Sequence, residues 1–121
     1  MATFVLPADR VHETAALCDY LVDRLDSDDT VHAVSTASPQ ASRDSDDAQN
    51  AIYSRLGAIA TVDRHTESAD AQTQALSSVA ERTDADEIVV GYAIEEVDER
   101  DFDQFLSNAT CPVVIVPDAA A

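Results

Sequence analysis

The sequence EIVVG at Glu87–Gly91 gives the strongest fold signal in the chain. A short, continuous apolar run that ends in glycine is typical of a strand buried on both faces, as in parallel sheets covered by helices. A second run of this kind, VVIV at Val113–Val116, lies between Pro112 and Pro117. Because two parallel strands need a crossover connection, we expect a helix between these two runs.

Apolar residues at helical spacing separate the other strand-like segments of the chain. We expect helices at residues 11–25, 48–56, 69–82 and 101–109, and further strands at residues 3–6, 30–35 and 58–62. Gly57 is well placed to end the second helix in a left-handed conformation. Residues 39–47 are polar and are expected to form a loop, and residues 26–29 a turn.

This alternation of strand and helix predicts one α/β domain at residues 1–117, followed by a loose tail at residues 118–121. Right-handed crossovers in such a chain give a doubly wound parallel sheet of five strands with helices on both faces. Binding sites in these sheets lie beyond the carboxyl ends of the strands, where the strand order reverses. We therefore expect any functional residues to gather at that edge.

Charge is the most unusual feature of the composition. The 121 residues include 24 acidic and 7 basic side chains, which gives a net charge of −17, and every basic residue is arginine. So negative a surface repels itself in dilute buffer, whereas molar salt shortens the Debye length to ~3 Å and screens the repulsion. We therefore expect an acidic, halophilic protein that works in a salt-filled cytoplasm. The alternative is an ordinary acidic surface.

Composition and charge also exclude several classes of protein. No apolar run approaches the ~18 residues that cross a bilayer, and residues 1–7 lack the basic flank of a signal peptide, so we expect a cytoplasmic protein that does not contact membranes. The negative charge disfavours binding to nucleic acid. Cys18 and Cys111 do not form a C-x-x-C pair and are expected to be buried, reduced thiols.

Two segments carry a resemblance to a known family. Residues 84–91, DADEIVVG, resemble the A-D-x-I-V-V-G motif of universal stress proteins (UspA-like), and residues 108–117, NATCPVVIVP, are similar to the closing A-x-C-P-V-x-V-V-P. A weaker match is LPAD at residues 6–9, similar to a P-x-D motif after the first strand. The resemblance implies a sheet of order 3-2-1-4-5, a role in the stress response and a homodimer. Together with the acidic composition, it points to an archaeal, haloarchaeal-type member.

The chain departs from the ATP-binding members of that family. They carry G-x-x-G, nine residues and G-[ST], but here only Gly91 matches, and Ile94 stands in place of the second glycine. Residues 95–99, EEVDE, would repel a triphosphate, and the two glycines of the chain cannot form the usual phosphate loops. We therefore expect no cofactor. Asp9, Val34 and Gly91 are the candidates for a vestigial nucleotide pocket.

The sequence contains no recognisable catalytic or metal motif, so we expect a protein that is not an enzyme. His12, His32 and His65 are scattered and lack metal-ligand spacing, and His12, next to Glu13, is expected to be a surface histidine rather than a ligand. A phospho-acceptor receiver domain is an alternative with the same alternation of elements. Asp63 could end its third strand and Asp9 could supply one acid, but the lysine that receivers need is missing.

The last strand predicts a partner. Val113, Val114, Ile115 and Val116 are apolar on both faces, and such a strand at a sheet edge must be covered or paired. Pairing with its own copy across a two-fold axis would form a homodimer, and cover within one chain is the alternative. We expect a non-catalytic domain that acts in the stress response through dimerisation or through an unknown protein partner. The alternatives are an adenine-nucleotide-binding protein with a degenerate phosphate loop and a receiver-like signalling domain.

Overall fold

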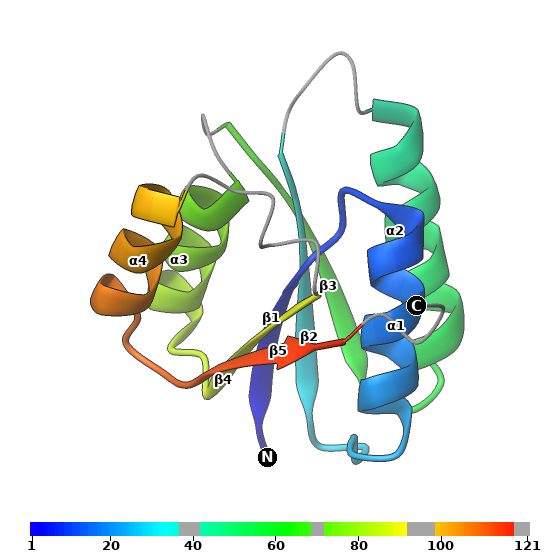
Figure 1. Cartoon of the computed structure of the whole chain (residues 1–121). Coiled ribbons are helices and arrows are strands. Elements are labelled where there is room, and N and C mark those ends of the chain that lie inside the picture. Colours follow the sequence, from blue (N-terminus) through cyan, green and yellow to red (C-terminus); the bar gives the residue numbers. More distant parts are fainter. Residues whose placement is uncertain (37–41, 69–71, 92–98, 118–121) are drawn as a thin grey trace.

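The computed structural model describes residues 1–36, 42–68, 72–91 and 99–117. Strands and helices alternate along the chain (Figure 1): β1 Thr3–Pro7, α1 Val11–Val22, β2 Thr30–Thr36, α2 Ser42–Leu56, β3 Thr61–Glu67, α3 Gln72–Thr83, β4 Glu87–Gly91, α4 Glu99–Asn108 and β5 Val113–Val116. The strands form one sheet of order β3-β2-β1-β4-β5, in which all neighbouring pairs are parallel. This confirms the predicted fold class.

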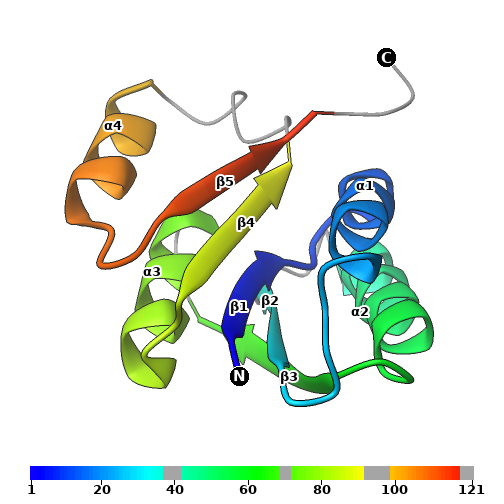
Figure 2. The same ribbon diagram turned by 90° about the horizontal axis from the view of Figure 1, so that it is seen from below.

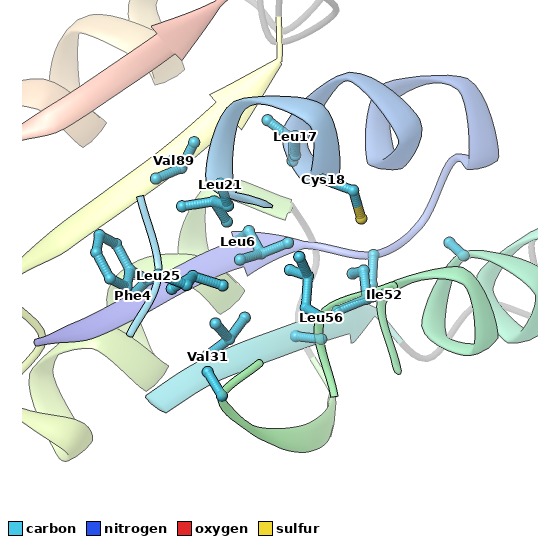
Figure 3. Packing of buried hydrophobic residues seen from close by; sticks show 14 of the residues in the cluster. Phe4, Leu6, Leu17, Cys18, Leu21, Leu25, Val31, Ile52, Leu56 and Val89 are labelled. Atoms are coloured by element: carbon cyan, nitrogen blue, oxygen red, sulfur yellow. The ribbon is translucent and has the colours of Figure 1, made fainter. Parts of the chain in front are cut away.

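Helices cover both faces of the sheet. α1 and α2 lie on one face, and α3 and α4 lie on the other (Figures 1 and 2). Side chains along β1 alternate between the two faces: Phe4 and Leu6 join the core under α1 and α2 (Figure 3), whereas Val5 joins the core under α3 and α4. Burial on both faces explains why the central strands consist of continuous apolar runs.

The third strand differs from its prediction. The sequence predicts a strand at residues 58–62, but β3 is Thr61–Glu67, and all of it pairs with β2. β3 is an edge strand whose residues are exposed or half-buried, so apolar burial contributes little to it. Its position depends on backbone pairing with β2, which an apolar pattern cannot reveal.

The second helix begins earlier than predicted. The sequence predicts a loop at residues 39–47, but α2 already begins at Ser42, and residues 39–41 lie outside the described part of the chain. Asp44 in the first turn is favourable, because a carboxylate near a helix N-terminus interacts with the helix dipole. Ser45 is buried even though it is polar. The acidic stretch that resembles a loop is therefore the start of a helix.

Gly57 does not adopt the predicted left-handed conformation, because neither described glycine has a positive φ. Its N–H continues the helical pattern by donating to the Tyr53 carbonyl oxygen at 2.9 Å. A Cβ on Gly57 would lie 2.5 Å from that oxygen, so glycine is required for space. The left-handed residue is Asp84, with a φ of 55°, directly after α3, and aspartate is one of the residues that tolerate this region.

The remaining boundaries change little. α1 ends at Val22 rather than at residue 25, and the predicted turn at residues 26–29 is present. There the Asp29 carboxylate accepts hydrogen bonds from the backbone N–H groups of Asp26 and Ala2, both at 2.8 Å, and these bonds lower the pKa of Asp29. The predicted tail lies outside the described residues. In the ranges that are described, no helix is long and apolar enough to cross a bilayer.

Candidate functional site

The strand order reverses between β1 and β4, and ligand sites of doubly wound sheets lie at the carboxyl ends of such a pair. β1 pairs with β2 from Thr3 to Pro7, but with β4 only at Phe4 and Val5. The carboxyl-terminal halves of β1 and β4 are therefore not paired with each other, and Figure 2 shows the two strands parting. Polar residues from α1, α2, α3 and β2 gather around this region.

Asp9, two residues after the end of β1, is the centre of a buried hydrogen-bond network. Its Oδ1 accepts bonds from the Thr36 backbone N–H at 2.9 Å and the Ser45 hydroxyl at 3.0 Å. Its Oδ2 accepts bonds from the Thr36 hydroxyl at 3.2 Å and the Gln72 amide at 3.1 Å. An ionised carboxylate has about four acceptor positions, and these four bonds use them. Asp9, 8% exposed, thereby ties β1 to β2, α2 and α3.

A second group of buried polar residues continues this network toward β3. The Ser35 hydroxyl donates to the Ala8 carbonyl at 2.8 Å, and the Gln49 side-chain amide of α2 donates to the Ser35 hydroxyl at 2.9 Å. The same amide nitrogen also bonds the carbonyls of Ala33 at 3.0 Å and His65 at 3.4 Å. The carboxyl ends of three strands are thus joined through side chains as well as through the sheet.

Glu13 fills the opposite side of the switch point. It lies in the first turn of α1 and is 8% exposed. Its side chain rests on Gly91 at the end of β4: a Cβ on Gly91 would lie 2.4 Å from Glu13 Cγ and 2.9 Å from Oε2. The N-terminus of a helix that follows a strand is a common anion-binding position in these folds. Here the protein places its own carboxylate there.

The three pocket candidates from the sequence therefore have different surroundings. Asp9 belongs to the hydrogen-bond network, and the three atoms closest to a Cβ on Gly91 all belong to Glu13. Val34 is 1% exposed in the core under α3, and its carbonyl accepts the Ala8 N–H at 2.8 Å. Of the acidic stretch at residues 95–99, residues 95–98 lie outside the described part of the chain, and Glu99 begins α4. Glu13 was missed by sequence reasoning, because an acidic residue in a helix start gives no sign of burial.

The two cysteines differ in burial. Cys18 is buried as predicted, and burial raises its pKa to about 11, which neighbouring Arg55 offsets only in part. Cys111 is only half-buried, which corrects the prediction, and burial together with Asp86 and Glu87 raises its pKa as well. The thiolate is the nucleophilic form of cysteine, and a raised pKa makes it scarce at neutral pH.

Two histidines that are scattered in the sequence form a part-buried pair. His32 of β2 is 8% exposed, and its Nδ1 lies 2.9 Å from Nε2 of His65 on β3. His12 is exposed, as predicted. The pair becomes visible only once β3 is known to extend to Glu67. Within the described ranges, no group of three His, Cys, Asp or Glu side chains could hold a metal ion.

The receiver alternative does not fit this sheet. Asp63 lies inside β3, which continues to Glu67, so it is not the acidic residue at a strand end that a receiver domain needs. The observed order 3-2-1-4-5 also differs from the order 2-1-3-4-5 of flavodoxin-like folds, to which receivers belong.

The last strand forms the other edge of the sheet. Among the described residues, β5 pairs only with β4, on one side. Val116 belongs to the core under α1 and α2, and half-buried Val114 packs against it, whereas half-buried Val113 packs against the core under α3 and α4. Ile115 is 43% exposed. An apolar side chain is thus left at the surface of an edge strand.

Known structures share this fold. A universal stress protein in complex with cAMP superimposes with a TM-score of 0.73 at 18% identity, covering 98% of this chain and 98% of that one. A universal stress protein family member from Arabidopsis thaliana with AMP bound gives a TM-score of 0.73 at 13% identity, covering 99% and 94%. A universal stress protein from Archaeoglobus fulgidus gives 0.63 at 15% identity, covering 96% and 93%. These likenesses establish the universal-stress-protein-like fold. No protein-family model and no curated protein sequence matches the chain.

Proposed function

We propose that this chain, with its universal-stress-protein-like fold, is a non-catalytic domain that does not bind ATP and acts as a homodimer in a high-salt cytoplasm. The observation that carries the proposal is the buried carboxylate of Glu13 against Gly91, at the switch point of the sheet. The raised pKa values of both thiols support the absence of cysteine catalysis.

Electrostatics argue against a triphosphate at this position. Two like charges 4 Å apart repel by about 4 kcal/mol at an effective dielectric constant of 20. A phosphate at the N-terminus of α1 would meet the carboxylate of Glu13, and each additional phosphate charge would add to the repulsion. The net charge of −17 opposes the approach of any polyanion in the same way.

The hydrogen bonds of Asp9 argue against a role in recognising a base. A carboxylate recognises the amino group of a base by accepting its N–H. The acceptor positions of Asp9 already serve Thr36, Ser45 and Gln72. A ligand would have to displace one of these internal bonds, and a buried donor left without an acceptor costs about 1–3 kcal/mol.

The edge strand supports the homodimer. Ile115 is partly exposed on β5, at the side where none of the described strands pairs with the β5 backbone. Pairing two copies of β5 across a two-fold axis would satisfy the backbone groups on that side and bury the isoleucine. We propose this as the way in which the domain acts, either directly or by presenting a dimer to a protein partner in the stress response.

A second candidate is an adenine-nucleotide-binding protein that accepts only nucleotides of low charge. Two proteins of the same fold were solved with cAMP and with AMP, which carry one phosphate each. A single phosphate meets less repulsion from Glu13 than a triphosphate does. The two candidates have the same fold and differ in whether a nucleotide with a single phosphate binds.

Titration calorimetry in molar KCl tests both candidates. We expect no heat of binding with ATP, and the first proposal fails if ATP binds stoichiometrically at micromolar concentration. Binding of AMP or cAMP without ATP would favour the second candidate. Glu13→Gln replaces the buried carboxyl group with a neutral amide of similar shape, and His12→Gln is the control at the adjacent exposed position. If Glu13 excludes phosphate, Glu13→Gln should gain affinity for nucleotides and His12→Gln should not.

A further inference from the structure

The His32–His65 pair lies on the α3 side of the sheet, near the β3 edge. His32 pairs in register with Asp63, and Val34 pairs with His65, so the two histidines are diagonal neighbours on one face. Their ring centroids are 5.0 Å apart, and Nδ1 of His32 lies 2.9 Å from Nε2 of His65. This is a direct hydrogen bond between two imidazole rings, each of which can take up a proton.

The hydrogen bond limits how many protons the pair can hold. It needs one N–H and one lone pair, so at least one of the two facing nitrogens must be unprotonated. The neutral pair and the singly protonated pair both satisfy this condition. Two imidazolium rings would direct N–H groups at each other over 2.9 Å, and burial would add a desolvation cost at His32. A second proton therefore requires the rings to separate.

The surrounding charges leave this limit in place. Asp63 on β3 lies 3.9 Å from His32 Nδ1, but its side chain is 54% exposed, so solvent screens it. Glu67 on β3 forms an ion pair with Arg82 of α3. The other charged residue of α3 is Glu81. β1 presents apolar Val5 opposite His32. Burial is the largest influence on His32 and lowers its pKa, as does His65, whereas Asp63 raises it.

The pair is also connected to the hydrogen-bond network at the strand ends. The His65 carbonyl accepts a bond from Gln49, which also bonds Ser35. Thr36, in the strand of His32, donates twice to Asp9. Separation of the two rings would remove the side-chain hydrogen bond between β2 and β3 that lies beside these contacts.

We propose that the His32–His65 pair is a pH-sensitive switch that holds the edge strand β3 on β2 at neutral pH and releases it when the pair takes up a second proton. Above the ordinary histidine pKa of about 6.5 the bond is intact. Below it, the unfolded chain binds two protons at these positions while the native pair binds at most one. The stability of the native state therefore decreases as the pH falls, and the edge strand β3 is the first part to be released.

Urea unfolding in molar KCl between pH 7.5 and pH 5 tests the switch. His65→Gln keeps a side chain that can accept a bond from protonated His32, and His12→Gln is the control at an exposed position. In the wild type the unfolded chain binds one proton more than the native pair. Below pH 6, each fall of one pH unit should therefore raise the unfolding equilibrium constant of the wild type by up to about tenfold relative to that of His65→Gln. His12→Gln should behave as the wild type. The carboxylates take up protons in all three proteins alike, so their effect on the unfolding equilibrium cancels when the proteins are compared. Equal pH dependence in wild type and His65→Gln would overturn the proposal.

Two measurements on the wild type keep the test independent of the variants. In NMR spectra, the ring signals of His32 and His65 should change together, as expected for a pair that takes up a single proton in the native protein. Complete and independent titration of both rings in the native protein would refute the pairing. Hydrogen exchange, corrected for the intrinsic effect of pH, should show β3 losing protection before β4 as the pH falls. Equal protection of the two strands would refute the release of the edge.

Discussion

The side chain of Glu13 occupies the space that a Cβ on Gly91 would need, with Glu13 Cγ 2.4 Å from that position. Glycine at residue 91 is therefore required by a neighbouring side chain, since its φ is not positive. The role of Gly91 in the structure therefore differs from the role that the sequence motif suggests. In the sequence it resembles the start of a phosphate loop, whereas in the structure it accommodates a buried carboxylate.

Gly91→Ala should destabilise the domain by about 1–3 kcal/mol, because the added methyl group forces Glu13 out of its position. The same substitution in a Glu13→Ala background should be nearly neutral, since the obstacle is gone. Urea unfolding of the two single variants and the double variant in molar KCl gives the coupling between the two positions. Equal costs of Gly91→Ala in both backgrounds would show that the contact is not the reason for the glycine.

Asp9→Ala should cost about 3 kcal/mol of unfolding free energy, because buried donors from Thr36, Ser45 and Gln72 lose their acceptor. Asp9→Asn should cost less, since the hydroxyl groups and the amide can turn to accept a bond. Asp47→Ala, at an exposed position of α2, removes the same charge and serves as control. If Asp47→Ala is as destabilising as Asp9→Ala, the network around Asp9 does not stabilise the fold.

Ile115→Lys should convert the proposed homodimer into a monomer, because it places a charge on the exposed side of β5. An apolar side chain that is fully buried contributes ~1.5–3 kcal/mol, and two copies would be lost in a symmetric interface. Ser54→Lys makes the same addition of charge on the surface of α2. Light scattering in molar KCl measures the mass of each protein. A monomeric wild type, or an Ile115→Lys variant that stays dimeric, would contradict the interface.

Salt should stabilise the native state. With a net charge of −17, repulsion increases as the screening length grows from ~3 Å in molar salt beyond ~4 Å below about half-molar salt. We expect the melting temperature to fall on dilution of KCl and the domain to lose compactness. Melting followed by circular dichroism over a KCl series measures this. A melting temperature that does not depend on KCl would rule out salt adaptation.

The thiol of Cys18 should react with a disulfide reagent only when the protein unfolds. Its pKa of about 11 leaves ~0.1% thiolate at pH 8, and its side chain is buried. Reaction at Cys111 should be faster, because that residue is half-buried, and its rate should rise with pH as thiolate forms. Stopped-flow measurements with and without urea separate the two thiols. Rapid reaction of both in the native protein would contradict the burial of Cys18.

The sequence predicts the fold well because the central strands are buried on both faces. Glu87–Gly91 is such a central strand, and it has the predicted bounds. Val113–Val116 also has the predicted bounds although it is an edge strand, since a continuous apolar run leaves few alternatives. β3 is misplaced because all its residues except Val62 are polar or charged and because its pairing partner is distant in the sequence. This single boundary also hides the histidine pair, because His65 belongs to a strand only once β3 extends to Glu67.

The candidate site is harder to predict than the fold. Asp9 is identified from its place after the first strand, but the donors that surround it come from β2, α2 and α3. Glu13 gives no signal, because an acidic residue in the first turn of a helix is ordinarily a solvated one. Its burial depends on β4 passing beside α1, which is a property of the folded chain.

The unlike edges of the sheet limit how far copies of the chain can assemble. β5 ends the sheet with an apolar strand, and β3 ends it with exposed charged residues such as Asp63 and Arg64. Charged side chains on an edge strand discourage the addition of another strand. Strand addition between two β5 edges would leave only β3 edges outside. Such a union would be self-terminating, and continuous sheets of many copies, the first step toward fibres, would not form by this route.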